Sequence, residues 1–231
     1  MLRIGALNQF YGGSHTLWDV ELDVPQGSVT CLMGRNGMGK TTLLRCIMGL
    51  LGTRSGSILY GDTELRGLPA ERRAALGIGY VPQGREIFSQ LTVEENLRIG
   101  LPVRKDRVRE VPERIYRMFP VLRDMMRRRG GDLSGGQQQQ LAIGRALVIE
   151  PRCLILDEPT EGIQPNIVHE IGEVIQLLNR EEGLTVLLVE QKLPFARRIA
   201  SHFRILDKGR VVAGGRIGEL SNALVGQHLT V

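Results

Sequence analysis

Residues 34–41 read GRNGMGKT, which places glycines, a lysine and a threonine at the spacing G-x-x-x-x-G-K-[ST]. The glycines let the backbone curl so that successive N–H groups point inward, at the positive end of a following helix. Such a loop binds phosphates, with Lys40 placed to reach the β- and γ-phosphate oxygens and the Thr41 hydroxyl placed to ligate Mg²⁺. The residues predicted to contact the nucleotide are Gly34, Arg35, Asn36, Gly37, Met38, Gly39, Lys40, Thr41 and Thr42.

Two adjacent carboxylates follow an apolar run later in the chain, in the stretch CLILDE at residues 153–158. The run predicts a buried strand, and open α/β sheets bind ligands at the carboxyl ends of their strands. We expect Asp157 to hold Mg²⁺ through water and Glu158 to polarise the water that attacks the γ-phosphate. Together with the phosphate loop, the two carboxylates predict hydrolysis of the nucleotide.

The stretch DLSGGQQQQLAIGRAL, residues 132–147, contains four consecutive glutamines. Apolar residues at helical spacing, among them Leu141 and Leu147, follow the glutamines and predict a helix that begins near Ser134. This apolar continuation argues against a disordered polyglutamine tract. We expect at least two of the glutamines at 138–140 to lie on the polar surface of the first helical turns.

The scaffold that positions these residues is predicted to alternate strands and helices. Short apolar or alternating segments predict strands at residues 2–10, 16–24, 28–33 and 78–83 and a hairpin at 55–65 that turns at 61–62. Helical spacing of apolar residues predicts helices through Leu43, Leu44, Ile47, Leu50 and Leu51, at 69–76, and through Ile167, Ile171, Val174, Ile175 and Leu178.

The second half of the chain contains two near-continuous apolar runs, RCLILD and LTVLLVE, which are typical of parallel strands covered on both faces. Residues 88–148 have a helical pattern, with Thr92 and Glu95 at the spacing of a capping box. A helix near 194–200, an antiparallel hairpin at 202–215 and a short tail close the chain. We therefore predict one α/β domain with a helical lobe and no internal repeat.

The composition is that of an ordinary globular protein, with 42% hydrophobic and 24% charged residues in 231. No apolar run approaches the roughly 18 residues that a membrane helix needs, and the N-terminal stretch lacks a signal-peptide pattern. Both observations favour a protein that is cytosolic or bound to a membrane through a partner. Cys31, Cys46 and Cys153 lie in apolar surroundings, so we expect buried free thiols.

The net charge of +5 arises from one segment. Residues 104–129 contain ten Lys or Arg and four Asp or Glu, so the rest of the chain is nearly neutral. This segment could touch nucleic acid or an anionic membrane surface. It could equally be a set of solvated helix faces, since Tyr116 and Phe119 are its only aromatic residues. Both interpretations remain open from the sequence.

The motifs together resemble the ATP-binding subunits of ABC transporters, over essentially the whole chain. The sequence LSGGQ at 133–137, between the phosphate loop and the carboxylate strand, matches the signature of that family. The resemblance implies an α/β P-loop NTPase fold, with a RecA-like parallel core, an antiparallel β subdomain and an inserted helical subdomain. It places the core at about 1–87 and 149–231 and the helical subdomain at about 88–148.

The family resemblance also assigns roles to single residues. Ser134, Gly135, Gly136 and Gln137 are expected at the start of a helix that faces the γ-phosphate of ATP held by the opposite subunit. Tyr11 matches the aromatic residue that stacks on adenine, although a tyrosine at a strand end could also belong to the core.

Gln83, at the end of the strand predicted at 78–83, and the segment after it are expected to respond to the membrane subunit. Gln83 matches the glutamine that reaches Mg²⁺ and the attacking water. Ile87, Phe88 and Leu91 match the surface that receives a helix of the membrane subunit, and core packing explains them equally well.

Two positions depart from the family pattern. Gln191 stands where a switch histidine is usual, and a glutamine can hydrogen-bond a phosphate or water but cannot carry a positive charge or move a proton. Glu158 would then activate water without that partner, and we count Gln191 with it as a catalytic residue. In the loop that follows Glu158, Gln164 replaces an aspartate that is usual in the family. Communication between subunits through that loop is therefore expected to differ.

The resemblance extends to the importers of hydrophobic amino acids and amides, through VEQ, GREIF and LTVEENL. Within that group the stretches DEPTEGIQPNIV and VEQKLPFAR are more similar to the urea transporter subunit than to the branched-chain amino acid subunits. The sequence thus predicts an ATPase that uses ATP and Mg²⁺ to drive an importer, with urea as the first cargo and branched-chain amino acids as the second.

This resemblance implies several partners. They are a second ATPase subunit, which is a sister chain or a second copy, membrane permease subunits, and indirectly a solute-binding protein, at the cytoplasmic face of the plasma membrane. A nucleic-acid clamp of the same ATPase class is the rival, but the coiled coils, zinc modules or doubled cassettes typical of such clamps are not visible, so no nucleic acid is expected. A metabolic kinase would leave LSGGQ without a role.

Overall fold

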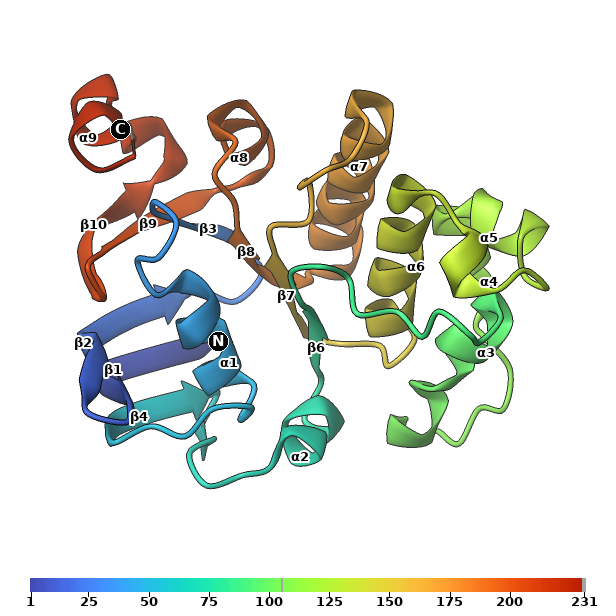
Figure 1. The fold of residues 1–231 in the computed structure, drawn as a ribbon, viewed down its shortest axis with the longest axis horizontal. Helices are drawn as coiled ribbons and strands as arrows, with labels where there is room; N and C mark the ends of the chain where they lie inside the picture. Colours follow the sequence, from blue (N-terminus) through green and yellow to red (C-terminus); the bar gives the residue numbers. More distant parts are fainter. Residues whose placement is uncertain (105, 230–231) are drawn as a thin grey trace.

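The computed structural model describes residues 1–104 and 106–229, which form two β-sheets with helices between and beside them (Figure 1). The four-stranded sheet is antiparallel, with the order β2-β1-β4-β5. Its strands are β1 (Leu2–Tyr11), β2 (Ser14–Val24), β4 (Ser55–Tyr60) and β5 (Thr63–Glu64). The predicted hairpin with its turn at 61–62 is formed by β4 and β5.

The six-stranded sheet has the order β10-β9-β3-β8-β7-β6 and is parallel except for β10 at its edge. Its strands are β3 (Val29–Met33), β6 (Ile78–Val81), β7 (Cys153–Asp157), β8 (Thr185–Val189), β9 (His202–Asp207) and β10 (Arg210–Arg216). Every residue of β3, β7 and β8 is buried, as expected for parallel strands that are covered on both faces. The sheet therefore brings the carboxyl ends of β3 and β7 to the same edge.

Helix α1 (Lys40–Ile47) lies between the two sheets (Figure 1). Its buried residues share one hydrophobic cluster with both sheets, including Leu43 of the helix, Leu7 of β1 and Leu187 of β8. This packing fixes the N-terminus of α1, and thus the phosphate loop, against the central strands.

The predicted extent of α1 through Leu50 and Leu51 is wrong, because the helix ends at Ile47. Gly49 takes a φ angle of 73°, which reverses the chain. The buried Arg73 guanidinium donates to the carbonyl oxygen of Ile47 and so satisfies the helix end.

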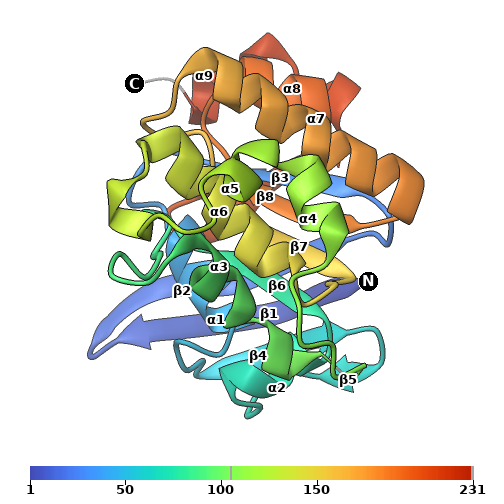
Figure 2. The ribbon, with the colours of Figure 1, turned by 90° about the vertical axis from the view of Figure 1, so that its right-hand side faces the viewer.

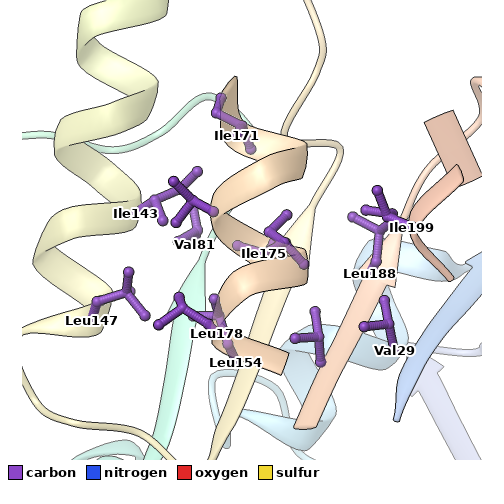
Figure 3. Close-up of a cluster of buried hydrophobic side chains, with 14 of the residues drawn as sticks. Val29, Val81, Ile143, Leu147, Leu154, Ile171, Ile175, Leu178, Leu188 and Ile199 are labelled. Carbon is purple, nitrogen blue, oxygen red and sulfur yellow. The ribbon is translucent and has the colours of Figure 1, made fainter. Parts of the chain in front are cut away.

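The other face of the six-stranded sheet is covered by α6 (Gly135–Leu147), α7 (Pro165–Glu182) and α8 (Leu193–Ile199). Figure 3 shows α7 packed between α6 and the strands, with Ile171, Ile175 and Leu178 pointing from α7 into the cluster. The apolar stripe predicted along α7 is confirmed, with Ile167 only partly buried at its N-terminal end. Since α6 and α7 share this core, movement of one is resisted by the other.

A helical lobe packs on α6 at the side away from the antiparallel sheet (Figures 1 and 2). Its elements are α3 (Val93–Arg98), η1 (Leu101–Val103), α4 (Glu113–Met118), α5 (Pro120–Asp124) and η2 (Gly130–Asp132). Thr92 caps α3, and the predicted capping box with Glu95 is present. The boundaries at 88 and 148 stay a prediction.

The remaining elements are α2 (Ala70–Ala75), which leads into β6, and the chain end. The segment predicted as a short tail contains η3 (Ile217–Glu219) and α9 (Asn222–His228), with Ser221 as the N-cap of α9. The three cysteines are free and buried, as predicted. Within residues 1–104 and 106–229, no helix has the length and apolar character that crossing a membrane requires.

Candidate nucleotide-binding and hydrolysis site

The phosphate loop connects β3 to α1, and its glycines adopt backbone angles that other residues avoid. The φ angles of Gly34, Gly37 and Gly39 are 155°, 79° and 101°. A Cβ atom on Gly34 would lie 2.3 Å from the carbonyl oxygen of Leu206 in β9. The loop therefore packs against β9 too closely for a side chain, which fixes its course above the sheet.

Lys40 is the first residue of α1, and its ammonium group is buried in the loop. The Nζ atom donates to the carbonyl oxygens of Gly34 (2.8 Å) and Arg35 (2.9 Å) and lies 3.6 Å from Glu158 Oε1. Burial lowers the pKa of Lys40, and the nearby Glu158 carboxylate opposes this shift. The positive charge is thus held at a fixed point beside the predicted general base, where phosphate oxygens would meet it.

Asp157 ends β7 and is only 1% exposed. Among the residues that the structure describes, neither of its carboxylate oxygens finds a donor with full hydrogen-bond geometry, although the Thr41 hydroxyl lies beside the group and favours its charged form. Burial has the larger effect and raises the pKa of Asp157 to about 6. A buried carboxylate with too few donors is stabilised by a bound cation.

The residues around Asp157 fit Mg²⁺. Thr41 offers a hydroxyl oxygen and Gln83 an amide oxygen, and both side chains line one cavity over the phosphate loop. Oxygen donors from one carboxylate, a hydroxyl and phosphates are the ligands that Mg²⁺ takes in nucleotide sites. Thr41, Gln83 and Asp157 could thus hold the cation, and their role as its ligands stays a prediction.

Glu158, directly after β7, is held by the residue that replaces the usual histidine. Its backbone has a φ angle of 48°, a conformation that costs a residue with a side chain about 1–3 kcal/mol. Gln191 Nε2 donates to Glu158 Oε1 (2.6 Å) and to Asn36 Oδ1 (2.7 Å). The structure therefore brings both predicted catalytic residues together and links them to the phosphate loop.

A buried carboxylate that the sequence analysis did not assign orders this region. Glu190 is 3% exposed, and its Oε1 accepts from the backbone N–H groups of Gln191 (2.8 Å) and Lys192 (2.9 Å). Its Oε2 accepts from the Thr160 hydroxyl at 2.7 Å. Glu190 thus fixes the backbone of Gln191, and its position after an apolar strand run was the signal available in the sequence.

A cavity of about 290 Å³ lies over the phosphate loop. It is lined by Thr16, Asn36, Gly37, Gly39, Lys40, Thr41, Thr42, Gln83 and Glu158. Thr16 was not predicted, and neither was Glu161, whose Oε2 accepts from Gln83 Nε2 at 3.0 Å. Tyr11 ends β1 and is 47% exposed, so its alternative role as a core residue is wrong. Its contact with adenine stays a prediction.

Helix α6 begins at the signature sequence, as predicted. Ser134 caps the helix, because its Oγ accepts from the backbone N–H of Gln137 (3.3 Å) while Gln137 Oε1 accepts from the backbone N–H of Ser134 (2.9 Å). The first turn of α6 lines a second cavity of about 710 Å³. Its lining residues are Pro120, Val121, Ser134, Gly135, Gly136, Gln137, Gln140, Gly162, Gln164, Ile167 and Glu170.

The two cavities share no residue. The first turn of α6 therefore does not line the cavity over the phosphate loop of its own chain. Gln164, the replacement noted in the sequence, lines the cavity of α6 instead.

The glutamines after the signature are not where the sequence predicted them. Gln139 and Gln140 are 4% and 3% exposed, so the expectation that at least two of residues 138–140 lie on the surface is wrong. Gln140 Nε2 donates to Glu170 Oε2 of α7 at 2.9 Å, while Gln139 Nε2 has no hydrogen-bond partner among residues 1–104 and 106–229. For Gln140 the reason is contact with α7, which the local sequence does not reveal.

The segment expected to meet a membrane subunit is only partly exposed. Phe88 is 48% exposed, whereas Ile87 and Leu91 are half-buried and Ile87 packs against the core. Core packing thus accounts for part of this set, and Phe88 is the residue available for contact.

The basic segment 104–129 is partly neutralised within the fold, and Lys105 lies outside the described residues. Arg104 pairs with Asp106 and with Glu150 (2.9 Å). Two further ion pairs join Arg114 to Glu182 and Arg123 to Glu113. Residues 127–129 form a run of exposed arginines.

Taken together, a glycine loop that holds a buried lysine next to two carboxylates at the sheet edge defines a P-loop nucleotide hydrolase. Comparison with known proteins narrows this class. A family profile described as "ABC transporter" matches residues 17–161. The chain therefore belongs to the ABC transporter family and is its ATP-binding cassette, an ATPase, as the sequence resemblance implied.

Two curated relatives cover almost the whole chain. The high-affinity branched-chain amino acid transport ATP-binding protein BraG of Pseudomonas aeruginosa is 43% identical over 213 residues, 92% of this chain and 91% of BraG. The probable branched-chain amino acid transport ATP-binding protein LivF of Archaeoglobus fulgidus is 41% identical over 221 residues, 95% of this chain and 94% of LivF.

Solved structures have the same fold. An ATP-binding subunit of an ABC transporter is 27% identical, with a TM-score of 0.85 and coverage of 100% of this chain and 95% of that one. A dimeric bacterial ABC transporter cassette is 25% identical, with a TM-score of 0.84 and coverage of 94% and 99%. The predicted fold, an α/β P-loop cassette, is confirmed.

Proposed function

We propose that this chain is the ATP-hydrolysing subunit of an importer for branched-chain amino acids, at the cytoplasmic face of a membrane. The names of BraG and LivF concern branched-chain amino acids and so favour the second cargo predicted from the sequence over urea. Urea remains a prediction carried by the residue patterns alone.

The observation that carries the proposed mechanism is the separation of the two anion-binding elements. The phosphate loop and the first turn of α6 line different cavities of one chain, yet both are backbone N–H sites at helix N-termini. We infer that two ATPase chains face each other, so that each ATP lies between the loop of one chain and the signature helix of the other. A solved relative of the fold is dimeric, which agrees with this arrangement.

Within this arrangement the side chains have separate roles. Lys40 and the loop amides bind the β- and γ-phosphates, and Ser134, Gly135 and Gly136 of the partner close over the γ-phosphate. Mg²⁺, held by Thr41, Asp157 and Gln83, would neutralise phosphate charge. Tyr11 would support the base.

Hydrolysis depends on Glu158, whose carboxylate accepts a hydrogen bond from Gln191 and lies beside Lys40. Glu158 takes the proton of the attacking water. Gln191 orients this carboxylate as a neutral donor. Loss of the γ-phosphate then removes the charge that holds the two chains together, and the permease subunits, in contact with Phe88, follow the opening.

Trapping the closed state tests the ATPase proposal. The Glu158→Gln variant should bind ATP and elute as a dimer in Mg²⁺·ATP, and Lys40→Ala in the same background should remain monomeric because the phosphates lose their cation. Turnover by Glu158→Gln equal to that of the wild type would remove Glu158 from its role.

Cargo is tested by uptake in a strain that lacks the gene. Labelled leucine uptake that falls on deletion and returns with the wild-type chain, but not with Lys40→Ala, would support the branched-chain assignment. Urea uptake with the same dependence, and unchanged leucine uptake, would replace it.

The rival, a clamp on nucleic acid, makes a different prediction for residues 127–129. If the chain is a transporter subunit, DNA or RNA should not change the ATPase activity of the wild type or of a variant in which these exposed arginines are replaced by acidic residues. Salt-sensitive nucleic-acid binding that charge reversal removes would favour the clamp.

A further inference from the structure

The segment directly after Gln83 has a strained backbone. Gly84, Arg85 and Glu86 have consecutive positive φ angles of 77°, 71° and 47°. Two of these residues, Arg85 and Glu86, carry side chains, for which this backbone conformation is strained. Such strain persists only where neighbouring contacts hold the segment in place.

The Arg85 side chain provides two of these contacts. Its Nη1 donates to Gln138 Oε1 in the first turns of α6 (3.3 Å), and its Nη2 donates to the carbonyl oxygen of Glu161 (3.4 Å). The guanidinium also lies at the start of α6, since a Cβ on Gly135 would be 3.3 Å from Nη2. In the described part of the chain, no carboxylate lies within ion-pair distance of Arg85.

Arg145, in the last turn of α6, contacts the same segment from the other end. Its Nη2 donates to the carbonyl oxygens of Arg85 (3.2 Å) and Glu86 (2.8 Å), and its guanidinium lies 5.3 Å from the centre of the Phe88 ring. The helix that carries the signature sequence is therefore joined to residues 84–88 at both of its ends.

The loop after β7 is the third element that contacts the Arg85 segment. Gln83 donates to the Glu161 side chain while Arg85 donates to the Glu161 backbone. Arg85 thus lies between the loop after Glu158, the segment after Gln83 and the first turn of α6. The planar guanidinium can hold two of these elements at a fixed distance, which a lysine ammonium cannot do with the same geometry.

We propose that Arg85 is a positioning residue for the signature helix: it sets the place of Ser134 and the α6 amides relative to the Gln83 segment, and so sets how well the helix meets the γ-phosphate of the partner's ATP. This inference rests on the proposed function and adds a residue that acts through α6 without touching nucleotide. Hydrogen-bond donors to a phosphate lose their effect when displaced by about 1 Å, so a loosened first turn weakens closure.

The test uses Arg85→Gly and Arg85→Met in the full chain, with Glu158→Gln added where dimers are measured. Glycine accepts a φ angle of 71° without strain, so Arg85→Gly removes the guanidinium and keeps the local fold. Arg85→Met keeps the aliphatic stem. Arg123→Met is the matched control, because Arg123 lies in the helical lobe, and its side chain pairs there with Glu113 and the Tyr116 ring.

The expected result separates ATP binding from closure. Binding of a fluorescent ATP analogue to the monomer should change less than twofold in both Arg85 variants, since the phosphate loop is untouched. The ATP-dependent dimer should weaken about tenfold and kcat should fall about tenfold, while Arg123→Met matches the parent. Gln138→Met should reproduce the loss, and adding it to Arg85→Met should have no further effect.

Two outcomes would overturn the inference. One is dimerisation and kcat within twofold of the parent in both Arg85 variants. The other is parallel loss of ATP binding and thermal stability in Arg85→Gly, which would show a general structural role. Failure of the proposed function would give a different result from failure of the Arg85 proposal. In that case the Glu158→Gln parent would form no dimer with ATP even though Arg85 is intact.

Discussion

The buried Asp157 carboxylate predicts that one substitution stabilises the isolated protein and destroys its response to Mg²⁺. Asp157 is 1% exposed and its pKa is raised from 3.8 to about 6. Since the pKa is higher in the folded state than in the unfolded chain, folding favours the protonated form. The stability that this group contributes is complete below pH 3.8 and is lost as the pH rises through about 6.

The size of the effect follows from the shift. Each pKa unit corresponds to about 1.4 kcal/mol, so a shift of roughly two units destabilises the charged protein by about 3 kcal/mol at pH 8. Asp157→Asn has nearly the same shape and no charge. The variant should be about 2–3 kcal/mol more stable than the wild type at pH 8 and nearly equal to it at pH 4.

The assay is denaturant unfolding at pH 4 and pH 8, with and without Mg²⁺ and ATP. With Mg²⁺·ATP at pH 8 the wild type should become more stable than Asp157→Asn, because only the wild type gains the binding free energy of the cation-bound nucleotide. Addition of EDTA should restore the original order. A variant that is less stable than the wild type at pH 8 without ligand, or that responds equally to Mg²⁺·ATP, would refute this account of Asp157.

Three further predictions concern other parts of the site. Gly34→Ala should lower the free energy of unfolding by more than about 2 kcal/mol and abolish nucleotide binding, since its Cβ would lie 2.3 Å from the Leu206 carbonyl oxygen. Gly52→Ala is the control, because the space around its Cβ is open. Equal stability of the two variants would contradict the prediction. Gln191→His should keep or increase kcat, because the imidazole can donate to the same carboxylate and also carry charge; abolished turnover would show that the neutral amide is required. Gln139→Leu should raise the free energy of unfolding by about 1 kcal/mol, because the buried Nε2 atom has no hydrogen-bond partner in the described part of the chain; a variant that is less stable than the wild type by more than about 1 kcal/mol would show that the amide makes a stabilising hydrogen bond.

The chemistry of the site was predictable because it is local in sequence. The loop from Gly34 to Thr41 and the pair Asp157 and Glu158 each follow an apolar strand run, so the sheet brings them to one edge by topology alone. The capping box at Ser134 is also a local pattern of four residues. In each case the residue types and their spacing already contain the geometry.

The features that were missed depend on contacts between distant segments. Gln140 is bound by Glu170 of α7, thirty residues later in the chain, and no local pattern marks this helix face as buried. Helix α1 ends early because Gly49 reverses the chain and Arg73 from the following segment binds its carboxyl end. The strain at Arg85 likewise follows from contacts with three elements.

The central claim is that each ATP is shared between two chains, and complementation tests it most directly. Lys40→Ala lacks the phosphate cation, and Ser134→Asp keeps a good helix cap while placing a negative charge against the γ-phosphate. Each variant alone should be inactive, but a mixture should recover ATPase activity, up to about one quarter of the wild type, because half of random dimers are mixed and each of these has one complete site. No recovery in a mixture that demonstrably forms mixed dimers would contradict the shared site.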